Sequence, residues 1–521
     1  MAEEQEWTKV AKLADLEDGV PISVEVGKAT VLLVKRGDSI HACGGECTHY
    51  GAPLAEGVLR DRVVTCPWHN ARLDVTTGEM VSPPALDPVA RYEVKAEDGE
   101  VFVGPSAKAR FPKPREEDGR TFVIVGGGAA GNAAAETLRR EGFAGRVVLI
   151  TREADGPYDR PNLSKEYLAG EAKPEWIPLR SEKFYANRNI ELMTETTVTG
   201  LDLEAKAVEL AGAQPLAFDR LLLATGATPR RLDIPGDDLD GVFLLRSLAD
   251  ARGLVGAAER ASKAVVLGAS FIAMEVASSL RKREVEVCVV APEEVPMARV
   301  FGPRVGRRIQ ALHESHGVAF RLGHTAREFA GEGAVQAVVL DDGTRLEADL
   351  VVVGIGVSPV VDYLEGTGLV EDGAVPVDGR LQTRAEGVFA AGDIARVPHP
   401  RTGEPQRIEH WVVAERQGQH AARAMLGSDA AYDEVPFFWT KQYDASVKYA
   451  GHATRPDRIV YRGDVTGGSF LAGYYEQGTL KAAASLGMAK EIILLGEVLK
   501  AGRSPSPEEL EDPATDLAQW L

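Results

Sequence analysis

The sequence lacks an excess of positive charge and has no long apolar run. Its formal net charge is −19. Nucleic acid and anionic membrane surfaces both require clustered positive charge, so we expect neither as a partner. No apolar stretch reaches membrane-spanning length, and the acidic N-terminus MAEEQEWTKVAKL differs from the basic start of a signal peptide. We therefore expect a cytoplasmic protein.

Cysteine is scarce, and low-complexity tracts and short-period repeats are absent. The chain has four cysteines, namely Cys43, Cys47, Cys66 and Cys288. Cys43 precedes the first ligand motif in a predicted glycine-rich turn, where an unpaired small residue is a simpler interpretation than a fifth ligand. Cys288 lies in EVEVCVVA, whose alternating and then apolar pattern predicts a buried strand. We therefore interpret Cys43 and Cys288 as packing residues.

The chain of 521 residues is too long for one ordinary core, so we expect about three or four domains. Residues 1–104 contain short alternating segments broken by Gly, Asp and Pro, which predict an all-β domain. Residues 105–120 are rich in proline and charge and predict a linker. Strands then alternate with helices, as in parallel α/β domains. From residue 428 the pattern changes to strands followed by a helical tail.

Two short motifs near the N-terminus pair one cysteine with one histidine each. They are Cys47-Thr48-His49 and Cys66-Pro67-Trp68-His69. Two thiolates can hold one iron of a two-iron cluster while two neutral imidazoles hold the other. A zinc site of two cysteines and two histidines is the alternative, but it would group Cys with Cys and His with His. The mixed halves favour a two-iron cluster.

The segment TFVIVGGGAAGNAAAETLRREG carries a dinucleotide-binding pattern. Gly126, Gly128 and Gly131 follow an apolar strand and open an alanine-rich helix, with Ala129 and Ala130 between them. Such glycines let the backbone approach a pyrophosphate at the helix N-terminus. The next strand ends at Glu153, about 20 residues further on, where a ribose-binding carboxylate is expected. This half is predicted to bind a dinucleotide.

A second, less regular half follows in KAVVLGASFIAMEVASSLRKREVEVCVVAPE. It keeps Gly268 but has Ser270 and Ala273 in place of the second and third glycines. Both residues are small, so the turn remains possible, although a degenerate half that binds nothing is the alternative. Its second strand ends at Ala291, where Glu293 or Glu294 can replace a ribose-binding acid. The absence of arginine at that strand end favours NADH over NADPH.

Seven further stretches complete a resemblance to a known family. From Thr121 to about His452 the chain resembles the flavin-dependent ferredoxin reductases of oxygenase systems and the apoptosis-inducing-factor family. The matching stretches are PYDRPNLSKEYL, LLLATGATPRRL, LLRSLADA, VVVGIGVSP, VFAAGDIA, RIEHWVVAERQG and PFFWTKQYD. The motif CTHYGAPL…CPWHNARLD resembles the Rieske signature, with asparagine at position 70 where glycine is common. Asparagine tolerates the left-handed backbone, so we expect only a mild departure.

The resemblance implies a multidomain fold, with an all-β Rieske domain, two α/β Rossmann-like units of the glutathione-reductase type and an α+β C-terminal domain. The implied ranges are a Rieske domain at 1–104, a linker at 105–120, an FAD-binding domain at 121–246 and 382–427, an NAD(P)H-binding domain at 247–381 and a C-terminal reductase domain at 428–521.

The resemblance also implies roles for individual residues. Lys165 corresponds to a lysine near flavin N5, Glu275 to a nicotinamide contact, and Trp439 to an aromatic residue that covers the flavin and relays or gates electrons. Trp411 is either a flavin contact or core packing. The remaining cofactor-binding residues implied are Arg160, Ala224, Thr225, Gly226, Arg246, Gly392, Asp393, Glu409 and His410 for FAD, and Phe271, Ile272, Gly354, Ile355 and Gly356 for NADH. The implied cluster ligands are Cys47, His49, Cys66 and His69.

The stretch RPNLSKEYL contains no cysteine, unlike the corresponding segment of disulfide reductases, so we do not expect thiol chemistry. The predicted function is electron transfer from NADH through FAD to the [2Fe-2S] Rieske cluster, and then to an external acceptor such as an oxygenase or another redox protein. Two alternatives are an NADH-binding redox sensor and an enzyme that reduces dioxygen or a quinone without the cluster. The chain is expected to be a monomer or a homodimer.

Overall fold

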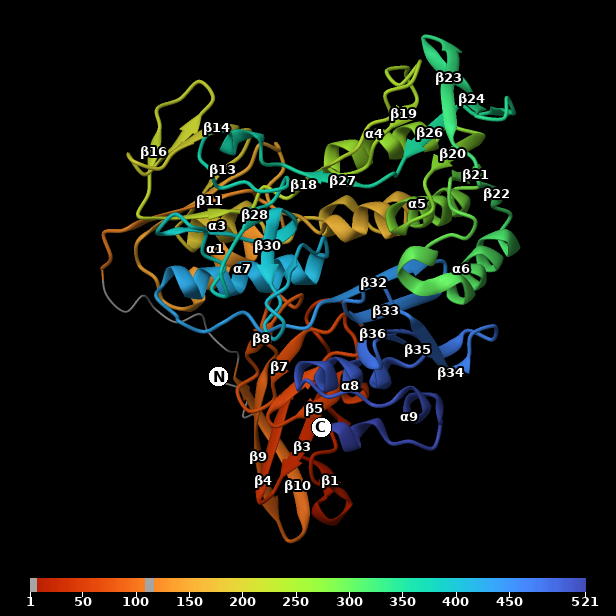
Figure 1. Cartoon of the computed structure of the whole chain (residues 1–521). Helices are drawn as coiled ribbons and strands as arrows, with labels where there is room; N and C mark the ends of the chain where they lie inside the picture. The colour runs from red at the N-terminus through yellow and green to blue at the C-terminus, as the bar shows by residue number, and fades with distance from the viewer. Residues whose placement is uncertain (1–6, 108–116) are drawn as a thin grey trace.

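The computed structural model describes residues 7–107 and 117–521. Figure 1 shows an N-terminal β region, in red and orange, beside a blue C-terminal region, with two α/β units above them. None of the helices in the described residues combines the length and apolarity needed to cross a membrane.

The N-terminal β region (residues 7–107) consists of two antiparallel sheets. The larger has the order β1-β10-β9-β4-β3-β2, and the smaller has the order β5-β6-β7-β8. The strands of the larger sheet are β1 (Thr8–Lys12), β2 (Ile22–Val26), β3 (Ala29–Arg36), β4 (Ser39–Gly44), β9 (Arg91–Glu97) and β10 (Glu100–Ala107). Those of the smaller are β5 (Val58–Arg60), β6 (Val63–Thr65), β7 (Arg72–Asp74) and β8 (Met80–Ser82). The prediction of an all-β region is therefore confirmed.

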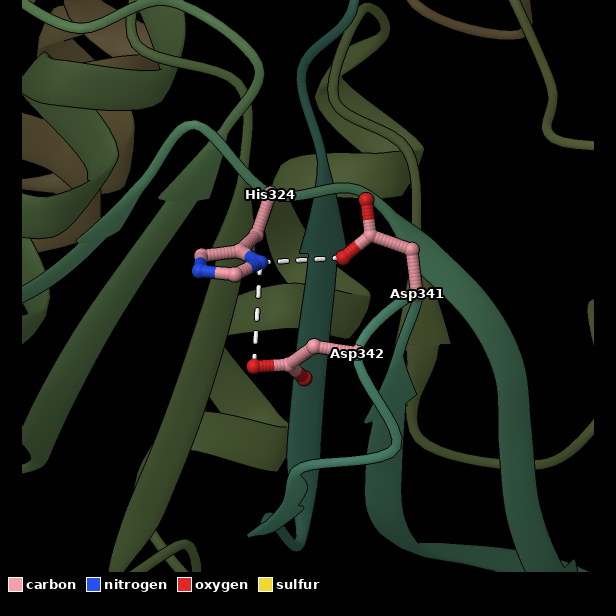
Figure 2. Close-up of side chains that lie close together, drawn as sticks. All are labelled: His324, Asp341 and Asp342. Carbon is pink, nitrogen blue, oxygen red and sulfur yellow. Dashed lines mark hydrogen bonds and ion pairs between the residues drawn. The ribbon is translucent and has the colours of Figure 1, made fainter.

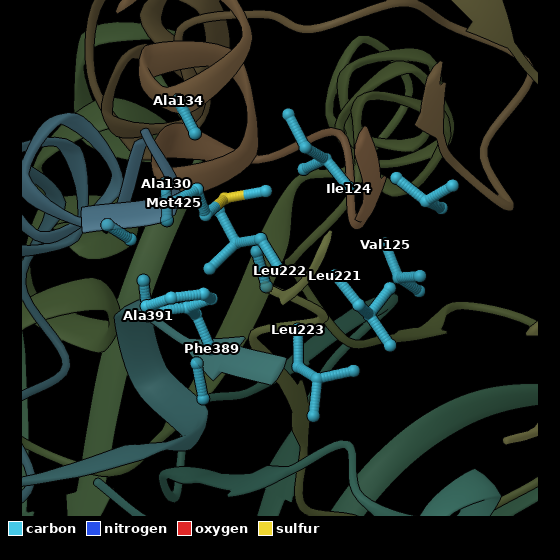
Figure 3. Close-up of a cluster of buried hydrophobic side chains, with 14 of the residues drawn as sticks. Ile124, Val125, Ala130, Ala134, Leu221, Leu222, Leu223, Phe389, Ala391 and Met425 are labelled. Carbon is cyan, nitrogen blue, oxygen red and sulfur yellow. The ribbon is translucent and has the colours of Figure 1, made fainter. Parts of the chain in front are cut away.

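The first α/β unit is built on a parallel sheet in the order β13-β12-β11-β17-β29. Its strands are β11 (Thr121–Val125), β12 (Arg146–Ile150), β13 (Ile190–Met193), β17 (Arg220–Leu223) and β29 (Val388–Ala390), and its helices are α1 (Ala129–Arg140), α3 (Glu182–Asn187) and α7 (Trp411–Met425). The short helix α2 (Glu166–Ala169) follows β12 in the chain but packs in the core of the second unit. Continuous apolar strands are typical of a sheet covered on both faces. Figure 3 shows the resulting core, in which Leu221, Leu222 and Leu223 of β17 lie among side chains of β11, α1 and α7.

A small antiparallel sheet, a small mixed sheet and one bridging pair complete the central part of the chain. One sheet contains β14 (Val198–Asp202), β15 (Ala207–Leu210) and β16 (Leu216–Ala217). The other contains β28 (Val375–Pro376), β30 (Ala395–Pro398) and β31 (Pro405–Gln406). The pair β18 (Ala227–Pro229) and β27 (Val357–Pro359) connects the two α/β units.

The second α/β unit has a parallel sheet in the order β19-β26-β20-β21-β22. Its strands are β19 (Val242–Phe243), β20 (Lys263–Leu267), β21 (Glu286–Ala291), β22 (Ala319–Leu322) and β26 (Leu350–Val353), and its helices are α4 (Leu248–Ala258), α5 (Phe271–Lys282) and α6 (Ala298–Ser315). An antiparallel meander of β23 (Ala326–Glu332), β24 (Ala334–Leu340) and β25 (Arg345–Glu347) packs on the sheet. Two doubly wound units confirm the predicted Rossmann-like fold.

The C-terminal region forms an antiparallel sheet in the order β32-β33-β36-β35-β34, followed by two helices. Its elements are β32 (Phe437–Gln442), β33 (Ala445–Gly451), β34 (Arg458–Asp464), β35 (Ser469–Glu476), β36 (Thr479–Leu486), α8 (Ala489–Lys500) and α9 (Pro507–Glu511). The predicted α+β character is confirmed.

Strand pairing or core packing extends across three of the predicted domain limits. β10 continues to Ala107, into the range predicted as a linker, because it pairs with β9 there, and residues 108–116 of that range lie outside the described residues. β19 lies before position 247, yet it pairs with β26 of the second unit. Val375 lies before position 382, yet it packs in the core of the first unit.

The two cysteines outside the Cys-His motifs are packing residues. Cys43 lies within strand β4 rather than in a turn, and it is fully buried. Cys288 lies in β21 as predicted, although it is only half-buried because it packs at the edge of the core beneath the meander.

Candidate functional site

The two Cys-His motifs converge in the N-terminal β region. Cys47 and His49 follow β4, and Cys66 and His69 lie between β6 and β7. The Nδ1 atoms of the two imidazoles are 3.0 Å apart, and the two cysteines are buried and hydrogen-bonded to each other. Two facing imidazoles beside two facing thiols match the donor set of a two-iron cluster with mixed ligands.

The protonation of three of these four groups suits metal binding, whereas the hydrogen bond with Cys66, together with burial, raises the pKa of Cys47. Burial lowers the pKa of His49 to about 3 and that of His69 well below its usual value, so both imidazoles are neutral at pH 7. The hydrogen bond with Cys47 lowers the pKa of Cys66 to about 7, and backbone N–H groups of Trp68 and His69 also favour its thiolate. Neutral imidazole and thiolate are the forms that bind metal.

The residue after the second histidine adopts the expected backbone. Asn70 has φ of +64°, in the left-handed region that asparagine tolerates. Its side chain is buried and accepts a hydrogen bond from Arg416 at 2.7 Å. The prediction of a left-handed asparagine is confirmed.

A cavity of about 440 Å³ lies between the two α/β units and reaches the C-terminal region. It is lined by most of the residues predicted to bind cofactors. These are Gly126, Gly128, Ala129, Ala130, Glu153, Arg160, Lys165, Ala224, Thr225, Gly226, Arg246, Ser270, Phe271, Ile272, Glu275, Gly354, Gly356, Gly392, Asp393, Glu409, His410, Trp411 and Trp439.

Three predicted cofactor residues and the predicted acids of the second unit do not line this cavity. Gly131 and Gly268 instead let another stretch of backbone pass close to them, at Gly126 and Gly354 respectively. Ile355 packs at the edge of the core beneath the meander. Glu293 and Glu294 follow β21 outside the cavity wall. None of the four cysteines lines the cavity either.

The first glycine turn fits a dinucleotide. A Cβ on Gly126 would lie 2.1 Å from the carbonyl oxygen of Ala224, and Gly126 has φ of +122°. A Cβ on Gly131 would lie 1.8 Å from the carbonyl oxygen of Gly126, so α1 packs directly on the turn. Gly128 faces open space, with nothing within 4 Å of an added Cβ. The turn thus leaves room for a pyrophosphate at the N-terminus of α1.

Ion pairs hold two predicted cofactor carboxylates on the cavity wall. Glu153 accepts a hydrogen bond from Arg160 at 3.0 Å and another from the hydroxyl of Tyr158. Asp393 accepts a hydrogen bond from Arg246 at 2.8 Å. These pairs fix the side-chain positions around the glycine turn.

A buried ion pair joins the two α/β units at the cavity. Lys165 Nζ lies 2.8 Å from Glu275 Oε2, and the side chains are 10% and 4% exposed. Ser164 and Thr440 each donate a hydrogen bond of 2.6 Å to the same carboxylate. Glu275 is therefore fully paired, and it receives groups from both units and the C-terminal region.

Trp439 of β32 lies between the cavity and the Cys-His motifs. Its ring centroid is 4.2 Å from that of His69 and 6.4 Å from that of His49. Trp411 lines the cavity and also packs against the cores of the first unit and the C-terminal region, so it is a packing residue and its flavin contact stays a prediction. One aromatic side chain thus separates the cavity from the facing imidazoles.

Several residues at this junction were not found by sequence reasoning. The hydroxyl of Tyr50 donates a hydrogen bond to Asp159, and Asn162 donates one to Tyr50 at 2.9 Å. Glu415 is buried beside Trp411, and burial raises its pKa well above its usual range. Asparagine in place of glycine at position 70 was the only feature of the sequence that marked this junction. The hydrogen-bonding partners of Tyr50 and Asn70 lie more than 100 residues away in the chain, so no local pattern predicts them.

A separate group of potential metal ligands lies on the surface of the second unit. Figure 2 shows His324 between Asp341 and Asp342, with His324 Nδ1 3.0 Å from Asp341 and 3.8 Å from Asp342. Thr325 donates two more hydrogen bonds to Asp341. We interpret this group as a surface hydrogen-bond network.

Comparison with protein families assigns three parts of the chain. Residues 6–93 match the Rieske [2Fe-2S] domain, residues 120–418 match pyridine nucleotide-disulphide oxidoreductase, and residues 437–521 match the reductase C-terminal domain. The Rieske match decides between the two metal interpretations in favour of the [2Fe-2S] cluster.

Individual relatives extend these matches. Apoptosis-inducing factor 3 of Homo sapiens is 38% identical over 96% of this chain and 85% of its own length. The ferredoxin–NAD(+) reductase component of the biphenyl dioxygenase system of Paraburkholderia xenovorans is 35% identical over 77% of this chain and 98% of its own. The crystal structure of a ferredoxin reductase from Rhodopseudomonas palustris, 35% identical, has a TM-score of 0.74 and covers 77% of this chain and 99% of its own.

Proposed function

Because the chain belongs to the pyridine nucleotide-disulphide oxidoreductase family and carries a Rieske domain, we propose that it passes electrons from NADH through FAD to its own cluster, and then to an external acceptor. The chain is an FAD-dependent NADH oxidoreductase of the ferredoxin reductase type. When bound, FAD accepts a hydride and the Rieske cluster accepts single electrons.

The position of Trp439 carries the proposal. Trp439 lines the cavity on one side and packs on His69 on the other, with ring centroids 4.2 Å apart. An electron that leaves the cavity in this direction meets the imidazole ligands after a single side chain. No cysteine lines the cavity, so thiol exchange has no group to act through, despite the family's name.

The residues around the cavity have complementary roles in this proposal. The N-terminus of α1 and the glycine turn bind the pyrophosphate of FAD. Lys165, held by Glu275, places a positive charge on the cavity wall, where it stabilises negative charge on a reduced ring system. Ser270 and Phe271 at the start of α5 lie where the second dinucleotide enters.

Anaerobic rapid mixing with NADH tests the electron path. Flavin absorbance should bleach first, and the cluster should then be reduced within one catalytic turnover. The EPR spectrum of the reduced protein reports the cluster independently of the flavin. A flavin that is reduced while the cluster stays oxidised for minutes would disprove the path.

A matched variant separates the cluster from the flavin. Cys47→Ser should abolish reduction of a protein acceptor, because the thiolate ligand is lost. Reduction of the small oxidant ferricyanide by the flavin should continue. Unchanged reduction of a protein acceptor would instead place its electron source at the flavin.

The names of the relatives support an acceptor class. Two relatives are the reductase components of the biphenyl and anthranilate dioxygenase systems. A solved complex joins putidaredoxin reductase, 31% identical to this chain, to putidaredoxin. We therefore assign an oxygenase or another redox protein as the acceptor. Purification of the reduced protein with its bound partners tests this assignment.

A further inference from the structure

We infer that Tyr50 and Asn70 are positioning residues, which hold the two histidine ligands of the cluster against the flavin cavity. Tyr50 directly follows His49, and Asn70 directly follows His69. Each of the two contacts the reductase part of the chain. This inference rests on the proposed electron path and names the residues that set its geometry.

The Tyr50 contact reaches the segment that forms one wall of the cavity. The Tyr50 hydroxyl donates a hydrogen bond to Asp159 and accepts one from Asn162 at 2.9 Å. Asp159 and Asn162 are 8% and 6% exposed, so water does not compete freely for either side chain. The next residues of this segment, including Arg160 and Lys165, line the cavity.

The Asn70 contact reaches helix α7 on another wall of the cavity. Arg416 donates hydrogen bonds to the backbone oxygen of Asn70 at 2.8 Å and to its side-chain oxygen at 2.7 Å. Arg416 is only 3% exposed and also donates to Ser82 at 2.9 Å. The same helix places Trp411 in the cavity wall.

The two contacts join the two histidine-bearing loops to two different walls of the cavity. Trp439 lines the cavity and packs on His69, so the imidazoles, the tryptophan and the cavity wall form one continuous junction. Charge-assisted hydrogen bonds in a buried setting are directional and hold atoms more closely than apolar packing does. Loss of one contact leaves the ligand loop intact, because its other bonds remain within the N-terminal region.

Two conservative variants each remove the side-chain hydrogen bonding of one contact. Tyr50→Phe deletes only the hydroxyl, and its ring still packs on His49. Asn70→Gly deletes the side-chain acceptor, leaves the backbone oxygen to accept from Arg416, and still permits φ of +64°. Two control variants lose comparable bonds that do not join the ligand loops to the cavity. Thr76→Val loses a hydrogen bond to Asp74 within the N-terminal region, and Arg423→Gln loses a surface ion pair of α7.

Rapid mixing of the holoprotein with NADH gives the first readout. Each variant should keep the wild-type rate of flavin reduction, and its cluster should be reduced roughly tenfold more slowly, since small misplacements of reacting groups have effects of this size. The double variant should be slower still, and both controls should match the wild type. An equilibrium redox titration followed by EPR should give an unchanged cluster potential. A rate loss explained by a shifted potential, or no rate loss in the double variant, would overturn the inference.

Amide hydrogen exchange gives a second readout, which does not depend on electron transfer. Residues 47–52 should exchange faster in Tyr50→Phe, and residues 66–72 should exchange faster in Asn70→Gly, while the controls stay protected. Unchanged exchange in both variants would contradict a positioning role. If the wild-type cluster stays oxidised after mixing, the proposed electron path fails, whereas the exchange result still decides whether the contacts hold the loops.

Discussion

The two dinucleotide turns share a backbone but differ in side chains. Gly128 and Ser270 precede α1 and α5 with ψ of −163° and −166°, so both turns enter their helices in nearly the same way. Gly126 and Gly268 have φ of +122° and +106°, and a Cβ on either would lie within 2.3 Å of a carbonyl oxygen. The comparison shows that the first glycine is required in both turns, whereas the second is not.

The third position of the glycine motif, Gly131 in the first unit and Ala273 in the second, accounts for the remaining difference between the two turns. A Cβ on Gly131 would lie 1.8 Å from the backbone of its turn, but the second unit has Ala273 there and buries it. Helix α5 must therefore lie slightly further from its turn than α1 does. The looser turn does not make the second unit degenerate, because its residues still line the shared cavity.

Gly131→Ala tests the closest contact of the first turn and should have the largest effect. The added methyl group forces α1 away from β11, so the variant should lose FAD and about 3 kcal/mol or more of unfolding free energy. Flavin content after purification and denaturant unfolding measure the two losses. The matched change Ala273→Gly should keep FAD and cost about 1 kcal/mol. Full flavin content in Gly131→Ala would show that the two turns tolerate side chains equally.

Gly268→Ala separates the functions of the two turns. The residue has positive φ, and its added Cβ would approach Gly354. We expect full FAD content, with flavin reduction by NADH slowed about 100-fold because the cofactor is misplaced. Reduction of the flavin by dithionite serves as the control and should be normal. A wild-type rate with NADH would mean that the second turn does not bind the nucleotide.

Lys165→Met breaks the ion pair that joins the two units. The buried Glu275 would lose its only cationic partner among the described contacts, at a cost of about 3 kcal/mol. Flavin reduction should also slow by about tenfold, because the cavity wall loses its positive charge. Lys441→Met is the control, since its pair with Glu166 is more exposed, at 39% and 32% of the two side chains, and is worth about 1 kcal/mol or less. Equal stability losses in the two variants would contradict the special role of the buried pair.

Ser270→Gly makes the second turn resemble the first and should have the smallest effect. Ser270 makes no capping hydrogen bond through its side chain, so its replacement by glycine removes only the volume of that side chain. The KM for NADH should fall by about threefold with kcat unchanged, since closer approach favours binding of the ground and transition states alike. Steady-state kinetics measure both constants. A higher KM would show that the serine itself binds the cofactor.

Sequence alone could predict the elements and ligands whose patterns are local. The glycine turns, the Cys-His pairs and the left-handed Asn70 all depend on residues close together in the chain. The limits of β10 and β19 were harder to predict, because strand ends depend on a partner strand elsewhere in the sequence. The ribose-binding role predicted for Glu153 stays a prediction, and its pairing with Arg160 was not visible in the motif.

The sequence by itself determined which cofactors this protein holds, because short motifs encode donor atoms and backbone turns over a few residues. Tertiary structure decided how the cofactor sites face one another. Arg416 and Asn70 are 346 residues apart, and Tyr50 and Asp159 are 109 residues apart. No local pattern encodes such pairs, since they form only when complete domains pack and exclude water between them.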